Sequence, residues 1–193
     1  MFKKVLAVFS RRRRTVVRTA IILQDRPEVL TIRHSTIHSL GSFSKKEIEQ
    51  GAHIRMMSGD VIDFKEVMSR INRGSLTPDD PLQIDTNLFI DLDPSSLAIN
   101  HSCNPNAGIR SQNELIAIRN IGAGEEVTFD YSTTVSRSVS PEAWSMKCKC
   151  KFKHCRLMIQ SVKSISKERL LKYQRANALP DYIVSELSGI LED

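Results

Sequence analysis

The sequence predicts a mainly β fold of the β-rich α+β class. Three observations predict it: many short runs rich in β-branched and aromatic residues, turn-forming glycine, proline and asparagine between those runs, and few segments with helical periodicity. The chain has 193 residues, enough to bury a core as one large domain, or one domain with small appendages. Hydrophobic residues make up 40% of the chain and charged residues 26%, which argues against a disordered or membrane class.

The predicted strands are short segments in the first two thirds of the chain, rich in valine, isoleucine, threonine and phenylalanine. They are residues 15–23, 28–34, 51–62, 86–92, 114–120 and 127–131. Gly59 interrupts the third segment. Gly122 and Gly124 allow the chain to reverse before the last one.

The predicted helices are fewer and lie in the middle and at the end of the chain. Residues 63–72 show helical spacing through Phe64, Val67, Met68 and Ile71, whereas 73–83 contain two prolines and a glycine and read as a loop. Residues 166–177 and 181–192 are also predicted as helices. In the latter, Ile183, Leu187, Ile190 and Leu191 share one face after Pro180, which predicts packing onto the core.

The chain is basic, with a formal net charge of +6 and a sequence pI of about 9.3. The basic residues gather at 11–14 (RRRR) and between Lys147 and Arg175. Such clusters suit acidic or nucleic-acid partners, but a solvated protein face explains them equally well. Aromatic residues are only 6% of the chain, so no base-stacking platform is evident.

The beginning of the chain does not predict export or membrane insertion. No apolar run approaches the ~20 residues of a spanning helix. The apolar stretch near the start is shorter than the ~7 residues of a secretory core, and no small-residue cleavage site follows it. We therefore expect an intracellular protein, in the nucleus, on chromosomes or in the cytoplasm, with no membrane partner.

The four cysteines predict a zinc site. Cys148, Cys150 and Cys155 lie in one turn-rich segment, KCKCKFKHC, and Cys103 lies alone in AINHSCNPNAG. Neighbouring Cys148 and Cys150 are poorly placed to pair as a disulfide, whereas Zn²⁺ takes four soft ligands in a tetrahedron. Unrelated free cysteines are the alternative reading, and His154 is a competing ligand.

Three motifs in order, NHSCNPN (100–106), GEEVTFDY (124–131) and CKCKFKHC (148–155), resemble those of SET-domain protein lysine methyltransferases with a post-SET zinc segment. Residues 35–62 are similar to the opening segment of that family. The resemblance implies a SET-type fold of small sheets with a pseudoknot-like core, a post-SET zinc segment and a C-terminal helical tail.

The domain organisation that the resemblance implies has four parts. These are a basic N-terminal extension (1–29), a SET domain (30–135) with an insertion at about 63–84, a post-SET zinc segment (144–160) and a helical tail (161–193).

The same resemblance implies roles for individual residues. Tyr131 is the expected catalytic tyrosine, and Phe129 the expected position that tunes how many methyl groups are added. If 127–131 is a strand, Val127, Phe129 and Tyr131 share a face, which can line a channel. The implied S-adenosylmethionine site comprises Leu40, Gly41, Asn100, His101 and Tyr131. The implied Zn²⁺ ligands are Cys103, Cys148, Cys150 and Cys155.

Three positions depart from the family pattern. Ser39 replaces the first glycine of a glycine-x-glycine turn, and Leu97 stands where an arginine is expected. Met57 falls where many members carry a second tyrosine, so the resemblance predicts a flexible apolar wall in the lysine pocket.

The implied activity is methyl transfer from S-adenosylmethionine to a lysine side chain of a protein substrate, such as a histone or another basic protein. A di- or trimethylating enzyme is expected, because Phe129 lacks a hydroxyl group. Two alternatives remain: a zinc-stapled nucleic-acid-binding module, and a catalytically inactive SET-fold protein that binds peptides.

Overall fold

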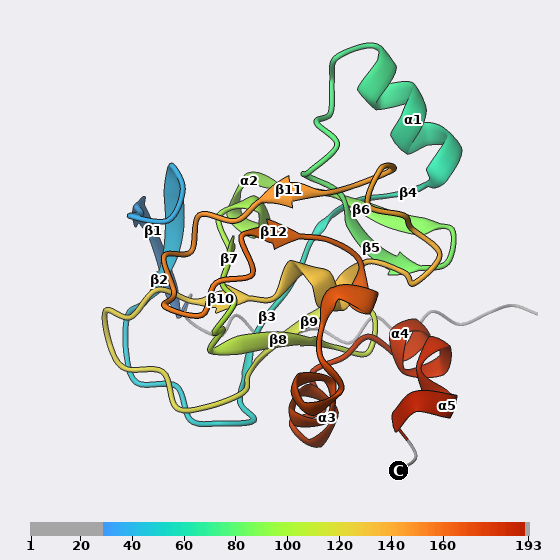
Figure 1. Ribbon diagram of the computed structural model, residues 1–193. Helices are drawn as coiled ribbons and strands as arrows, with labels where there is room; N and C mark the ends of the chain where they lie inside the picture. Colours follow the sequence, from blue (N-terminus) through green and yellow to red (C-terminus); the bar gives the residue numbers. More distant parts are fainter. Residues whose placement is uncertain (1–28, 192–193) are drawn as a thin grey trace, which may run out of the picture.

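The computed structural model describes residues 29–191 (Figure 1). The predicted strand 15–23, the arginine run 11–14 and the basic extension up to residue 28 lie outside the described residues. Among residues 29–191, no helix has the length and apolar character needed to cross a bilayer.

Small sheets dominate the fold, as the sequence predicted. Strands β1 (Leu30–His34) and β2 (Leu40–Ser44) form an antiparallel hairpin. One three-stranded sheet has the order β3 (His53–Met56), β9 (Glu114–Ala117), β8 (Ala107–Arg110), and another has the order β4 (Gly59–Asp63), β6 (Leu88–Leu92), β5 (Leu82–Asp85). Short β7 (Asn100–His101) runs parallel to β10 (Thr128–Phe129), and β11 (Met146–Lys147) pairs with β12 (Met158–Ile159).

The prediction of one interrupted strand at 51–62 is wrong. The segment forms β3 and β4, which belong to different sheets and are separated at Met57 and Ser58. A Cβ on Gly59 would lie 1.9 Å from the carbonyl oxygen of Asp91, so β6 passes too close for any side chain there. The glycine therefore permits a close strand pairing, and the chain changes sheet just before it.

Helices occupy two ends of the molecule in Figure 1, with α1 (Phe64–Asn72) at the top and the C-terminal helices at the bottom. Asp63 caps α1 by accepting a 2.8 Å hydrogen bond from the backbone of Glu66. The remaining helical segments are α2 (Pro94–Leu97), the 3₁₀ turns η1 (Tyr131–Thr134) and η2 (Val162–Ser164), α3 (Lys167–Arg175), α4 (Asp181–Glu186) and α5 (Ser188–Leu191). The predicted helix 181–192 is thus divided at Leu187.

The apolar residues that share the helical spacing of α1 are only partly buried. Val67 is buried, whereas Phe64 is 53% exposed and Met68 40% exposed. The helix covers only a small satellite cluster around Ile62 and Leu76, because it projects from the edge of the β4–β6–β5 sheet.

Two hydrophobic clusters form most of the core. The first joins the sheets between Leu30 and Phe129. The second joins η2, α3, α4 and α5, with Ile118 packed against it from the SET-like part. Ile183, Leu187, Ile190 and Leu191 belong to this second cluster, as their spacing predicted.

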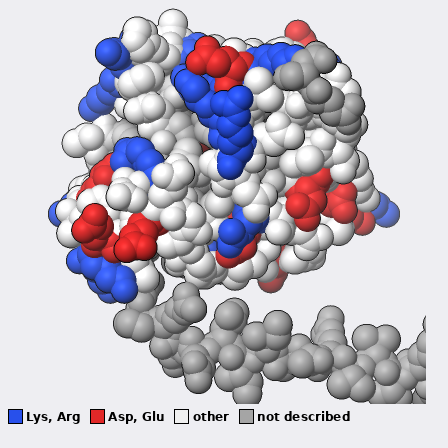
Figure 2. Space-filling view, turned by 90° about the horizontal axis from the view of Figure 1, so that it is seen from below, with Lys and Arg blue, Asp and Glu red and all other residues white. Residues whose placement is uncertain are grey.

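Charge is mixed on one face of the described part of the molecule. On the face seen from below in Figure 2, clusters of lysine and arginine alternate with clusters of aspartate and glutamate. This face carries no single continuous basic surface.

Candidate active site and metal centre

A cavity of about 530 Å³ brings most of the predicted active-site residues together. Asn100 and His101 reach it from β7, Phe129 from β10 and Tyr131 from η1. The hairpin turn between β1 and β2, the loop before β5, helix α2 and the post-SET segment complete its wall. They contribute Ile37, His38, Asp79, Asp80, Leu97, Trp144, Lys147 and Lys149, among others.

The aromatic rings of Phe129 and Tyr131 are neighbours, but the prediction that they share one face of a strand is wrong. The two ring centroids are 4.7 Å apart. Strand β10 ends at Phe129, and Tyr131 begins the 3₁₀ turn η1, so the residues do not share a strand face. Asp130 caps this turn through the backbone of Ser132, which brings Tyr131 back toward Phe129.

Tyr131 is held at both its backbone and its hydroxyl group. Its backbone N–H donates to Nδ1 of His101 at 3.1 Å, and its hydroxyl donates to the carbonyl oxygen of Ile99 at 2.7 Å. Burial, reinforced by Asp80 and Asp79, raises the pKa of the Tyr131 phenol well above its ordinary value. The phenol is therefore neutral at physiological pH and can act as a hydrogen-bond donor or acceptor.

Asn100 links the cavity to the β1–β2 hairpin. Its amide donates to the Leu40 carbonyl at 2.9 Å and to Glu126 at 2.7 Å. A Cβ on Gly41 would lie 2.3 Å from the same Glu126 carboxylate, so only glycine fits beside it. Leu40 and Gly41 lie next to Asn100 but do not line the cavity, whereas His38 does.

The three departures from the family pattern have different structural outcomes. Ser39 has a φ of 39°, in the left-handed region that glycine favours. Leu97 lines the cavity. Met57 is 0% exposed and packs in the main core, and it is not among the cavity residues, so the expectation that it forms a wall of the pocket is wrong.

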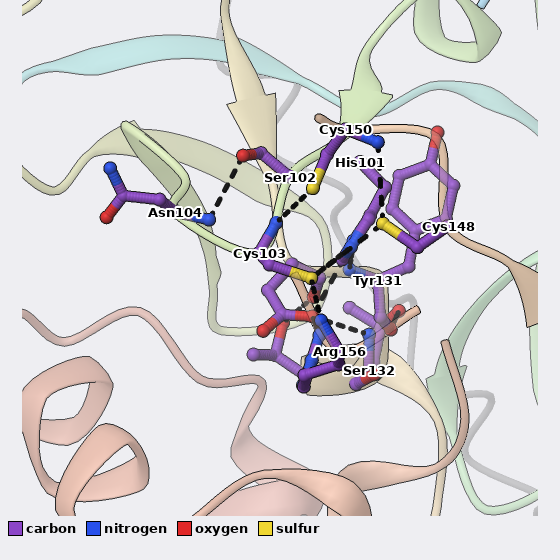
Figure 3. A network of polar contacts seen from close by, with 12 residues as sticks. His101, Ser102, Cys103, Asn104, Tyr131, Ser132, Cys148, Cys150 and Arg156 are labelled. Atoms are coloured by element: carbon purple, nitrogen blue, oxygen red, sulfur yellow. Dashed lines mark hydrogen bonds and ion pairs between the residues drawn. The ribbon is translucent and has the colours of Figure 1, made fainter. Parts of the chain in front are cut away.

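Cys103, Cys148 and Cys150 converge beside the cavity (Figure 3), and Cys155 contacts Cys103 there. All four are free thiols, and Cys103 is buried. The sulfur of Cys103 lies 3.7 Å from that of Cys148 and 4.0 Å from that of Cys155. With Zn–S bonds of about 2.3 Å, sulfurs at the corners of a tetrahedron are separated by about 3.8 Å, so these distances fit zinc.

His101 is a competing ligand that sequence reasoning missed. Ligand atoms of His101, Cys103, Cys148 and Cys150 all lie within 4.8 Å of one another. Its Nε2 is 3.4 Å from the Cys103 sulfur, while burial lowers the pKa of His101 to about 4 and keeps the ring neutral. The competitor named from the sequence, His154, instead makes a ring contact with Phe152.

Three further residues support the site, and none received a role from sequence reasoning. Asp130 is 1% exposed, and its carboxylate accepts hydrogen bonds from Arg156 and Tyr173. Two signals were present: Asp130 lies inside GEEVTFDY, and Arg156 directly follows Cys155. Tyr173 lies outside every motif and carried no signal.

Comparison with known proteins supports the resemblance to the SET domain that the motifs indicated. Residues 39–132 match the family model described as the SET domain. Over 105 residues the chain is 35% identical to a Candida albicans protein named "Histone-lysine N-methyltransferase, H3 lysine-36 specific", and the match covers 48% of this chain and 12% of that protein.

A solved structure gives independent support for the fold. It is titled "crystal structure of KRYPTONITE in complex with mCHG DNA and SAH" and matches with a TM-score of 0.52 at 20% identity. The match covers 67% of this chain and 28% of that chain. Residues 39–132 of this chain therefore match the SET domain, and the fold of the chain is similar to that of this solved structure.

Proposed function

We propose that the protein is an S-adenosylmethionine-dependent protein lysine N-methyltransferase. The observation that carries the proposal is the single cavity that gathers Asn100, His101, Phe129 and Tyr131 within a SET domain. The substrate is a lysine side chain of a basic protein such as a histone, because the Candida albicans relative is named as a histone-lysine enzyme.

The described residues fit the cofactor. Asn100 and His101 line the cavity, and the carbonyl groups of His38 and Leu40 lie beside Asn100. Gly41 leaves no side chain between this hairpin and Glu126. When bound, S-adenosylmethionine supplies an electrophilic methyl group on a positively charged sulfur. Asn100, His101 and the Leu40–Gly41 backbone hold it, with Tyr131 beside it.

The remaining wall handles the lysine amine. Asp79 and Asp80 attract its ammonium form as it enters, since both line the cavity. A free lysine has a pKa of about 10.4, so the amine must lose a proton before it can attack. The apolar surfaces of Phe129 and Ile99 disfavour the charged form and exclude water. The neutral Tyr131 hydroxyl orients the amine's lone pair.

The metal has a structural role in this proposal. Cys103, Cys148, Cys150 and Cys155 hold Zn²⁺ and fasten the post-SET segment to the loop after β7. That segment supplies Trp144, Lys147 and Lys149 to the cavity wall, so the metal stabilises one side of the site without entering the reaction.

The proposed domain boundaries follow the same division. The SET domain comprises 30–135 with the insertion at about 63–84, the zinc segment comprises 144–160, and the tail begins at 161. The separate hydrophobic cluster that starts at Val162 supports the last boundary.

The test is methylation with labelled S-adenosylmethionine, using histones and cell-lysate proteins as substrates, followed by peptide mapping. We expect label on lysine with the unmodified chain, and loss of most transfer with Tyr131→Phe while cofactor affinity stays within about twofold. Unchanged turnover in Tyr131→Phe would remove the tyrosine from the mechanism.

Two other outcomes would replace the proposal. Binding of S-adenosylmethionine without turnover on any protein substrate would favour the inactive peptide-binding reading. No cofactor binding, with salt-sensitive nucleic-acid binding instead, would favour the zinc-stapled nucleic-acid module.

A further inference from the structure

The carboxylate of Asp130 is the meeting point of three separate parts of the chain. Its Oδ1 accepts a hydrogen bond from the backbone N–H of Ser132 at 3.2 Å, within η1. The same oxygen is paired with the Arg156 guanidinium at 2.5 Å. Its Oδ2 accepts from the hydroxyl of Tyr173, in α3, at 3.0 Å. The Asp130 side chain is 0% exposed, so these partners replace its hydration.

Arg156 connects this carboxylate to the metal-binding cysteines. It directly follows Cys155, and its backbone N–H donates to the sulfur of Cys103 at 3.4 Å (Figure 3). Arg156 thus contacts Asp130 with its guanidinium and a sulfur of the predicted zinc site with its backbone. A residue of α3, Arg169, also donates to the carbonyl of Cys103.

Asp130 also contacts the backbone turn that carries the predicted catalytic tyrosine, Tyr131. It immediately precedes Tyr131 and caps the 3₁₀ turn that Tyr131 begins. The Tyr131 N–H donates to Nδ1 of His101, and that nitrogen is 3.6 Å from Asp130 Oδ1. A displacement of Asp130 therefore shifts the backbone from which the Tyr131 ring extends.

We infer that Asp130 is a positioning residue that couples order in the zinc segment and in α3 to the placement of Tyr131. The effect of this placement on methyl transfer rests on the proposed function. Arg156 and Tyr173 together hold the carboxylate in place, so losing either contact loosens η1 even when the metal stays bound. The C-terminal tail then contributes to the reaction through Tyr173, although it does not line the cavity.

The test compares Tyr173→Phe and Asp130→Asn with the unmodified chain. Tyr173→Phe removes one oxygen and keeps the buried ring, and Asp130→Asn keeps the shape but not the charge. The matched control is Glu168→Gln, which removes an exposed carboxylate paired with Lys172 in α3, away from the cavity. Each variant is examined for zinc content, for amide hydrogen exchange in peptides covering 129–134, and for kcat and KM.

We expect both variants to retain zinc, to exchange faster in 129–134 by on the order of 10-fold, and to lose kcat by a similar factor with KM little changed. Glu168→Gln should change none of these readouts. Exchange in 129–134 that matches the control in Tyr173→Phe would overturn the inference, even if Asp130→Asn fails to fold. If the unmodified chain methylates no substrate, the proposed function fails. The positioning role of Asp130 is then still tested, because hydrogen exchange and zinc content can be compared between the variants and the unmodified chain without any activity.

Discussion

At the scale of single residues, the absence of a hydroxyl group on Phe129 affects how much space the cavity offers beside Tyr131. Phe129 is 3% exposed, and its ring packs 4.7 Å from that of Tyr131. If the protein methylates lysine as proposed, a hydroxyl group on this ring would reduce the room for the amine, whereas the phenyl ring leaves room for an amine that already carries a methyl group. Met57 does not compensate, because it is buried in the core away from the cavity.

We predict that the protein adds more than one methyl group and that Phe129→Tyr shifts the product toward monomethyl-lysine. The first transfer should be largely preserved, because the amine still reaches Tyr131. Mass spectrometry of the product peptide measures the distribution. Phe89→Tyr is the control, since Phe89 packs against Phe64 outside the cavity and should leave the distribution unchanged. Monomethyl-lysine alone from the unmodified chain, after long incubation with excess cofactor, contradicts the prediction.

At the scale of elements, the short β11–β12 hairpin has little hydrogen bonding of its own. It pairs only Met146 with Ile159 and Lys147 with Met158. A two-stranded ribbon of this size is not stable alone, so cross-linking by metal is the natural means of ordering it. The cysteine sulfurs that gather in the segment between its strands and at Cys103 offer the ligands for such a cross-link.

We predict about one zinc per chain, with four cysteine ligands. Cys103→Ser, Cys150→Ser and Cys155→Ser should each lose the metal, whereas His101→Gln and the control His154→Gln should retain it. Metal analysis of the purified variants, with circular dichroism to confirm folding, measures this. If Cys155→Ser keeps full zinc and His101→Gln loses it, the fourth ligand is the histidine of the more compact cluster.

The β8–β9 hairpin gives a pH-dependent contribution to stability. Hydrogen bonds from Arg110 at 2.7 and 2.8 Å, and then from His53, lower the pKa of Glu114 from 4.5 to about 2 despite partial burial. A carboxyl group whose pKa is lowered by folding stabilises the native state above its unfolded pKa. That contribution is lost as pH falls from about 4.5 toward 2.

Glu114→Gln should therefore cost about 1–2 kcal/mol of unfolding free energy at pH 6 and progressively less below pH ~4.5. Urea denaturation of both proteins across this range measures the difference. Comparing the two chains cancels the pH dependence of the cysteines, which both retain. A difference that stays constant down to pH ~3 contradicts the assigned pKa.

At the scale of the whole molecule, the C-terminal helices close the structure around η1. Besides the contact from Tyr173 to Asp130, the Tyr182 hydroxyl donates to the carbonyl of Thr134, at the other end of η1. Glu186 accepts a hydrogen bond from Ser136 at 2.6 Å. The tail thus holds the turn that carries Tyr131 at both ends while burying its own hydrophobic cluster.

Because the tail and the SET domain share these contacts, we expect them to unfold together. Leu187→Ala, at a position only 1% exposed, should lower stability by about 2–5 kcal/mol and lower the midpoint for both parts. Val184→Ala is the matched control, since Val184, in α4 just before Leu187, is 38% exposed and should cost less than about 1 kcal/mol. Hydrogen exchange resolved by segment measures it. Loss of protection in the tail alone would show two independent units.

The sequence by itself determined the fold class and the order of the motifs, and it identified three of the four residues of the compact ligand cluster, Cys103, Cys148 and Cys150. Alternation, turn residues and cysteine spacing are local signals, and they sufficed for the small sheets and for the tail's apolar face at Ile183 and Leu187. The motif resemblance also selected Asn100, His101, Phe129 and Tyr131, which the structure brings to one cavity. Their individual roles remain predictions.

Only the tertiary structure decided how those residues are held. Tyr131 meets Phe129 through a 3₁₀ turn rather than a strand face, and Tyr173 reaches Asp130 across 43 residues of sequence. Met57 turns into the core, and residues 51–62 divide between two sheets. Each of these outcomes depends on which distant strand or buried charge competes for a segment, and local periodicity carries no information about such long-range partners.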